Sequence, residues 1–166
     1  MIGIFDVGYS NDSALVGCVS LAEFADAVPS REWVVDVGTV GPYEPGQFWK
    51  RELAPLLRGV DSAADLSVCV IDAYVDLGEA RTPGLGRLLY ERTGIPVIGV
   101  AKSRYPDSPR EFEIRRGSST RPLFVSTAGF DQEEAKRCIM RMAGLGRVPT
   151  TIRRADRLSR GSVPRM

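Results

Sequence analysis

The pattern of apolar residues changes near residue 60, and this change restricts the folds that the chain can adopt. Before that point, runs rich in β-branched residues lie between turn-forming clusters, which predicts strands over residues 1–9, 14–20 and 31–38. The connections between these strands are short enough for an antiparallel meander. A Pro/Gly loop follows, and then an amphipathic pattern predicts a helix over about residues 47–58.

Beyond residue 60 the apolar runs become continuous. Residues 66–72 and 95–101 are interpreted as buried strands, and residues 83–93 between them as a helix. Continuous apolar strands that alternate with helices indicate a sheet covered on both faces. The order predicts an α/β protein with a ribonuclease H-like mixed sheet, in which three antiparallel strands are followed by βαβ crossovers with helices on both faces.

The last part of the chain predicts a short hairpin that turns at Gly117 and a helix over about residues 131–143. Residues 144–166 are basic and punctuated by Gly and Pro, so they are expected to form a C-terminal tail. A chain of 166 residues is the size of one ordinary domain, and residues 1–166 are therefore expected to form a single domain.

Composition excludes several classes of protein. The chain has no histidine, which removes Ser-His-Asp triads, imidazole zinc sites and histidine acid–base catalysis. Its cysteines are widely spaced in apolar surroundings and are interpreted as buried thiols: Cys18, Cys69 and Cys138. No apolar run reaches the roughly 18 residues that span a bilayer, and the N-terminus lacks signal-peptide features, so a cytoplasmic protein without a membrane partner is expected.

Positive charge gathers after residue 100. Residues 1–100 hold 7 Lys and Arg against 14 Asp and Glu, whereas residues 101–166 hold 15 against 7. Most of the basic residues in the second part are arginines, whose planar fork suits phosphate recognition. The second part is therefore a candidate surface for a polyanion, with a solvated basic face as the alternative.

Three carboxylates occupy positions that carboxylates usually avoid. Asp6 lies within the first predicted strand, Glu52 lies on the apolar side of the predicted helix, and Asp72 ends a buried strand. If the first and fourth strands are neighbours, the three acids converge. Clustered carboxylates without histidine or cysteine match the preference of Mg²⁺, with Mn²⁺ as a second choice, and indicate phosphodiester hydrolysis. For each acid alone, the alternative is an ion pair or a cap.

Around these acids the sequence resembles endonuclease V, a family of ribonuclease H-like nucleases that nick DNA, or in some members RNA, near deaminated bases. The resemblance is divergent, and the family's N-terminal helix does not precede Asp6. The matching segments, in chain order, are FDVGY (5–9), PYEPG (42–46), FWKRELAPLL (48–57), VIDAYVDLG (70–78), GIPVIGVAKSR (94–104), RPLFVSTAG (121–129) and RRADRLSR (153–160).

This resemblance implies roles for individual residues. Asp6, Glu52 and Asp72 would be the metal-site carboxylates, and Lys102 would lie near the scissile phosphate. Nucleic-acid contacts are expected from a strand-separating wedge and from residues after the apolar strand. They are Tyr43, Pro45, Gly46 and Ser103. The basic part beyond residue 100 adds candidate phosphate contacts, which are Arg104, Arg115, Arg116, Arg121, Arg153 and Arg154.

Two departures from the family pattern bear on these roles. The place of a family histidine holds Phe130, with Asp131 beside it, so Asp131 is predicted to be either a fourth oxygen ligand of the metal or an N-cap. The family's small, glycine-containing stretch near the base is replaced by the bulkier residues 73–78.

The sequence therefore predicts a metal-dependent endonuclease that hydrolyses phosphodiester bonds in DNA or RNA, near deaminated or otherwise altered bases, in nucleic-acid repair. The alternative is a catalytically weakened or inactive nucleic-acid-binding relative of endonuclease V. Retention of the three acids and Lys102 favours the enzyme, whereas the missing histidine and the altered stretch favour the alternative.

Overall fold

The computed structural model describes residues 1–42, 44–45 and 48–161. Its strands are β1 (Ile2–Ser10), β2 (Ser13–Leu21), β3 (Arg31–Thr39), β4 (Val68–Ile71), β5 (Asp76–Leu77), β6 (Thr82–Pro83), β7 (Val97–Ala101), β8 (Glu113–Ile114) and β9 (Leu123–Ala128). Its helices are α1 (Phe48–Asp61), α2 (Leu85–Thr93), α3 (Gln132–Arg141) and α4 (Thr150–Ser159), with a 3-10 turn over Arg110–Phe112. These bounds confirm the three-strand start and the alternation of strands and helices beyond residue 60.

Seven strands form one sheet in the order β3-β2-β1-β4-β7-β9-β8. Strands β1, β2 and β3 are antiparallel, strands β1, β4 and β7 run parallel, and β9 returns antiparallel to β7. This is the predicted mixed sheet of ribonuclease H-like type. We call the end where β4 and β7 finish the carboxyl end of the sheet, and the end where they begin the opposite end.

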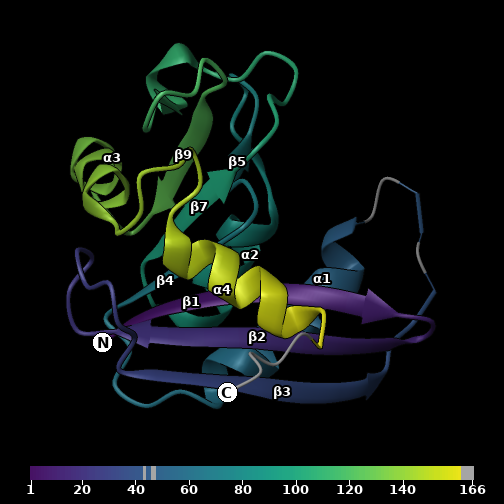
Figure 1. The fold of residues 1–166 in the computed structure, drawn as a ribbon. Coiled ribbons are helices and arrows are strands. Elements are labelled where there is room, and N and C mark those ends of the chain that lie inside the picture. The colour runs from purple at the N-terminus through teal and green to yellow at the C-terminus, as the bar shows by residue number, and fades with distance from the viewer. Residues whose placement is uncertain (43, 46–47, 162–166) are drawn as a thin grey trace.

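Helices cover both faces of the sheet (Figure 1). Because side chains alternate along β1, Ile4 packs in the core beneath α3 and α4, whereas Phe5 packs in the core beneath α1 and α2. The strands of the centre are buried throughout, with β4 and β7 entirely apolar except for one glycine. The buried central strands therefore hold the residues at the carboxyl end of the sheet in fixed positions.

Helix α4 corrects the prediction of a basic tail over residues 144–166. It lies across β1 and β2 (Figure 1), with Ile152, Ala155 and Leu158 buried in the core. The helix approaches so closely that a Cβ on Gly17 would lie 2.0 Å from the Ala155 carbonyl oxygen, and a Cβ on Gly8 would lie 2.2 Å from that of Ser159. Gly8 and Gly17 thus leave the space that α4 occupies, and one side of α4 belongs to the core.

Two further features complete the fold. The small antiparallel pair β5–β6, which the sequence did not predict, lies between β4 and α2. Strand β8 pairs antiparallel with β9, as the hairpin around Gly117 predicted, although β8 has only two residues. Within the described residues, no helix is long and apolar enough to cross a membrane.

Candidate nuclease active site

Two of the predicted acids lie side by side at the carboxyl end of the sheet. Strands β1 and β4 pair in parallel up to Phe5 and Ile71, so Asp6 and Asp72 follow directly on neighbouring strands. The strand adjacency on which their convergence depended is therefore present. Glu52 comes from α1 and is only 7% exposed, as its place on the apolar side of the helix predicted.

Asp6 faces α4. The Ser159 hydroxyl donates a hydrogen bond to the Asp6 Oδ2 atom at 2.6 Å, and Gly8 leaves room for this approach. Burial raises the pKa of Asp6 to about 6; the Ser159 hydrogen bond opposes the rise, and the negative charges of Asp72 and Asp156 add to it. The carboxylate is therefore held in a place that disfavours its charged form.

Glu52 is the second acid whose charge is poorly compensated. Burial raises the pKa of Glu52 to about 7, and the charges of Asp6 and Asp72 raise it further, while Tyr9 and Arg51 beside it act in the opposite direction. Two acids with raised pKa values thus influence each other. Perturbed, partly buried acids of this kind mark functional sites more often than structural ones.

Lys102 is the positive charge of the site. It follows β7, the neighbour of β4 in the sheet, and its ammonium forms an ion pair with the Asp72 carboxylate. The Lys102 side chain is 36% exposed and that of Asp72 is 21% exposed, so both can be reached from solvent. The arrangement gives an acidic centre with one lysine at its rim.

An aromatic pocket opens beside Asp72. Its volume is about 320 Å³, and its walls include Trp49, Tyr74, Leu77 and Tyr105. The Tyr74 hydroxyl donates to the Ser103 carbonyl oxygen at 2.9 Å and accepts from the Tyr105 backbone N–H at 3.1 Å. The bulky residues after Asp72 therefore line a cavity instead of filling it.

The sequence and fold were compared with known proteins. Endonuclease V of Roseiflexus sp. is 33% identical over 189 residues, covering 96% of this chain and 81% of that protein. The chain belongs to the endonuclease V family. The crystal structure of Streptomyces avermitilis endonuclease V superposes with a TM-score of 0.77 at 28% identity, covering 97% of this chain and 80% of that one.

A more distant structure shares the fold of the endonuclease V family. Ciona intestinalis endonuclease V, crystallised with a 24mer DNA that contains an inosine followed by a ribo-adenosine, superposes with a TM-score of 0.77 at 19% identity. It covers 96% of this chain and 84% of that chain. No family model matches the sequence. The comparisons confirm the recognition of the family and its ribonuclease H-like fold, and they make the chain a member of a nuclease family.

The donor set fits a hard divalent cation. Asp6, Glu52 and Asp72 offer only carboxylate oxygens, and the uncompensated charges of the first two are what a cation would neutralise. Over residues 1–42, 44–45 and 48–161, however, no three His, Cys, Asp or Glu side chains lie close enough together to hold one ion. Since Mg²⁺ is commonly bound through one or two carboxylates plus water and substrate phosphate, the three acids need not all contact one ion for the site to fit it.

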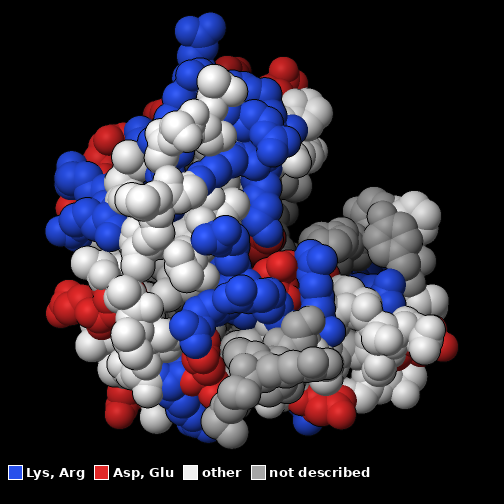
Figure 2. All heavy atoms as spheres, in the orientation of Figure 1, with Lys and Arg blue, Asp and Glu red and all other residues white. Residues whose placement is uncertain are grey.

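The basic residues predicted to contact nucleic acid differ in whether an acid already pairs with them. Figure 2 shows Lys and Arg gathered over α4 and the region above it, around a smaller group of Asp and Glu. Arg153 on α4 is exposed, and no ion pair engages it among the described residues. By contrast, Arg104 pairs with Glu113, and Arg154 pairs with Glu32 of β3, where Arg154 Nη2 lies 2.6 Å from the Glu32 carboxylate. The prediction for Arg116 is wrong, because its side chain is buried against backbone carbonyls.

The remaining predicted contacts are in two loops. Ser103 is exposed directly after Lys102, and Pro45 is exposed in the turn before α1. The predictions for Tyr43 and Gly46 fall outside the described residues. Pro45 and Ser103 are therefore accessible to a nucleic acid at the carboxyl end of the sheet and at the wedge loop.

Of its two predicted roles, Asp131 has that of an N-cap. Its carboxylate accepts a hydrogen bond from the Glu134 backbone N–H at 2.8 Å, at the N-cap of α3. In the β7–β9 pair Ala128 is opposite Val97, the first residue of β7. Because β9 runs antiparallel to β7, Asp131 follows at the opposite end of the sheet from Asp72 and Lys102. Asp131 therefore caps α3 at a distance from the acids of the carboxyl end.

Asp156 is an acid of the site that sequence reasoning missed. It lies on α4, its negative charge raises the pKa of Asp6, and the Arg160 Nη2 atom donates to its carboxylate at 2.8 Å. The segment RRADRLSR already marked this stretch as similar to the family. A helical interpretation of residues 150–159 would have set Asp156 and Ser159 three residues apart, on neighbouring positions of one face.

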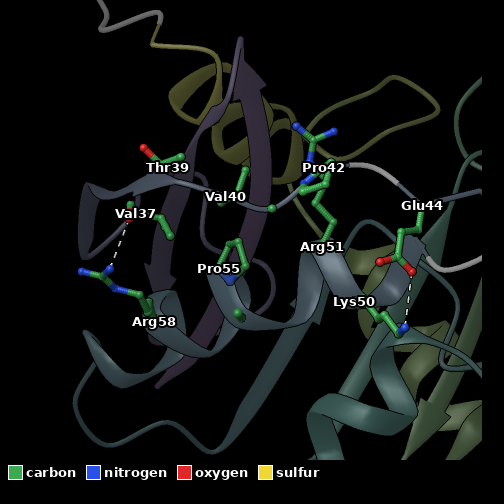
Figure 3. A pocket seen from close by; sticks show the side chains of 11 residues that line it. Val37, Thr39, Val40, Pro42, Glu44, Lys50, Arg51, Pro55 and Arg58 are labelled. Atoms are coloured by element: carbon green, nitrogen blue, oxygen red, sulfur yellow. Dashed lines mark hydrogen bonds and ion pairs between the residues drawn. The ribbon is translucent and has the colours of Figure 1, made fainter.

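A second cavity lies beside α1. It has a volume of about 440 Å³ between α1 and the segment after β3, and its cations are Lys50, Arg51 and Arg58 (Figure 3). Lys50 pairs with Glu44 at 3.4 Å, and the Arg58 guanidinium donates to the Val37 carbonyl oxygen at 3.3 Å. None of the predicted catalytic residues lines it, so it is distinct from the acidic centre.

Proposed function

We propose that the chain is a metal-dependent endonuclease that hydrolyses a phosphodiester bond in DNA near a deaminated base. The observation that carries the proposal is the electrostatic influence among the acids at the carboxyl end of the sheet, where the charges of Asp6 and Asp72 raise the pKa of Glu52 and Lys102 pairs with Asp72. Membership of the endonuclease V family supports it, as does the crystal structure of the Ciona intestinalis relative with inosine-containing DNA.

Asp6, Glu52 and Asp72 are the residues that would hold Mg²⁺ or Mn²⁺. Such an ion supplies Lewis-acid stabilisation of the negative charge that develops on the phosphate oxygens. Lys102 presents a compact positive charge to the same phosphate, and its ion pair with Asp72 orients the ammonium. The basic surface around α4 holds the backbone of the strand through Coulomb attraction.

The aromatic pocket beside Asp72 is the proposed place for the altered base. Enzymes that act at a damaged nucleotide commonly turn the base out of the stack and hold it between aromatic side chains. Trp49, Tyr74 and Tyr105 provide such walls within the cavity of about 320 Å³. Because the Tyr74 hydroxyl is already engaged by Ser103 and Tyr105, that wall offers stacking and shape more than hydrogen bonds.

The decisive test is a cleavage assay with labelled single and double strands of DNA and of RNA, each with inosine or undamaged, with and without Mg²⁺. We expect inosine-dependent cleavage of DNA that requires the metal and that falls at least about 100-fold in Asp6→Asn, because a buried acid that holds the metal is removed. Asp26→Asn is the matched control, since Asp26 is a half-buried loop acid whose carboxylate accepts the Glu23 backbone N–H.

The second candidate is a nucleic-acid-binding relative without cleavage. The ion pair of Lys102 with Asp72 favours it, because the ammonium compensates the carboxylate charge that a metal ion would otherwise neutralise. Binding of the same strands without cleavage under all metal conditions would establish this candidate. Cleavage that is equal in wild type and Asp6→Asn would overturn the proposed centre.

A further inference from the structure

Arg147 clamps the backbone on which Lys102 sits. Its guanidinium donates to the Lys102 carbonyl oxygen and, from both Nε and Nη2, to the Pro122 carbonyl oxygen at 3.2 and 2.7 Å. Lys102 is the first residue after β7, and Pro122 is the last residue before β9. The arginine thus joins two carbonyls at the point where the hydrogen bonds between β7 and β9 stop.

The loop that carries Arg147 is itself held from beneath. Arg116, only 4% exposed, donates to the carbonyl oxygens of Met142, Gly144 and Gly146 at 2.5, 3.1 and 2.8 Å. A Cβ on Gly117 would lie 2.1 Å from the Leu145 carbonyl oxygen, so this loop packs tightly against the turn before β9. The backbone that carries Arg147 is therefore held in a fixed position.

Neither arginine is used in an ion pair. Within the described part of the chain, Arg116 and Arg147 have backbone carbonyls as their partners and no carboxylate. Arg116 donates from Nη1 and Nη2 and Arg147 from Nε and Nη2, a planar geometry that lysine does not reproduce. Such an arrangement fixes the position of a backbone segment more than it balances charge.

We infer that Arg147 is a positioning residue for Lys102: by holding the Lys102 carbonyl, it keeps the lysine at the phosphate. This inference rests on the proposed function, in which Lys102 contacts the scissile phosphate. Displacement of a catalytic group by about 1 Å lowers a rate by as much as about 100-fold, so a clamp on its backbone has a measurable effect. The α3–α4 loop is thereby part of the active site although it carries none of the acids.

The test is a double-mutant cycle between Arg147 and Lys102. We expect Arg147→Gln to lower kcat about tenfold or more with KM nearly unchanged, and Arg147→Lys, which keeps the charge but not the fork, to stay impaired. In a Lys102→Met background, Arg147→Gln should cause little further loss, because the residue it positions is gone. Arg58→Gln, which removes an exposed arginine that donates to the Val37 carbonyl, is the control and should keep wild-type kcat.

Other outcomes separate this inference from the proposed function. Equal fractional losses in both backgrounds, or an unchanged kcat in Arg147→Gln, would overturn the positioning role and leave Arg147 as a structural staple. If the wild type cleaves no strand, the proposed function fails, and amide hydrogen exchange still tests the clamp. Arg147→Gln should then speed exchange at residues 102–104 more than in β2, and equal changes in both segments would overturn it.

Discussion

The two ends of the central sheet treat acidic side chains in opposite ways. At the carboxyl end, burial raises the pKa of Asp6 to about 6 and that of Glu52 to about 7. At the opposite end, Asp131 caps α3, Glu133 pairs with Lys136 at 3.0 Å, and Glu134 pairs with Arg137 at 2.8 Å. The acids at the opposite end thus have partners that compensate their charge, whereas the charges of Asp6 and Glu52 are poorly compensated. Such a pair of acids marks the carboxyl end as the functional end.

The largest expected effect is on the pH dependence of stability in metal-free protein. Asp6 and Glu52 have higher pKa values in the folded protein than in the unfolded chain, so between about pH 4 and 7 the folded state binds more protons. The free energy of unfolding should therefore fall as pH rises through this window, by about 1–3 kcal/mol between pH 5 and 8. Urea unfolding with a chelator present measures it.

A variant at the carboxyl end sharpens this contrast. Asp6→Asn should flatten the pH dependence because it removes one of the two acids whose pKa is raised by burial. Added Mg²⁺ at pH 8 should restore stability to the wild type, since a ligand bound only by the folded state stabilises it. A wild-type stability that rises between pH 5 and 8 would contradict the buried charges at the carboxyl end.

A smaller effect is expected from the cap at the opposite end. Asp131→Ala should cost about 1 kcal/mol of unfolding free energy because α3 loses its N-cap, while Asp131→Ser keeps a capping oxygen and nearly all the stability. Both variants should cleave at the wild-type rate. Thermal unfolding and the cleavage assay measure the two effects. A stable Asp131→Ser protein without activity would contradict this assignment and indicate that Asp131 is a metal ligand.

The parts of the site that sequence reasoning predicted are those that depend on local pattern. Asp6 interrupts an apolar strand, Glu52 lies at helical spacing among apolar residues, and Asp72 ends a buried run, so each is visible within a few residues. Their meeting needed only one long-range assumption, the adjacency of β1 and β4, and the structure confirms that adjacency.

The parts that sequence reasoning missed depend on contacts between distant segments. Helix α4 has a narrow apolar stripe among arginines, and its burial requires the seat that Gly8 and Gly17 create in β1 and β2. The choice between the two roles of Asp131 depended on the direction of β9, which places it at one end of the sheet or the other. Asp156 remained unassigned because it gains a role only once α4 lies on β1.

The smallest expected effect is on the salt dependence of DNA binding. It distinguishes two neighbouring arginines of α4, one exposed and one held in an ion pair. Arg153 is exposed, whereas the Arg154 guanidinium is held by the half-buried Glu32 carboxylate. We expect Arg153→Gln to reduce the slope of log K against log salt for duplex DNA by about 0.9, the value of one lost phosphate contact, with unchanged stability. Fluorescence anisotropy between about 50 and 200 mM salt, the range over which such contacts are revealed, measures the slope.

Arg154→Gln should behave in the reverse way. It leaves Glu32 without its partner and so lowers the free energy of unfolding, while the slope stays near the wild-type value because the guanidinium was already engaged. The two substitutions remove the same charge from adjacent positions, so any general electrostatic effect of α4 is common to both. Equal slopes for the two variants would show that the ion pair with Glu32 opens when DNA binds, and the division of α4 into a DNA-facing and a structural arginine would be wrong.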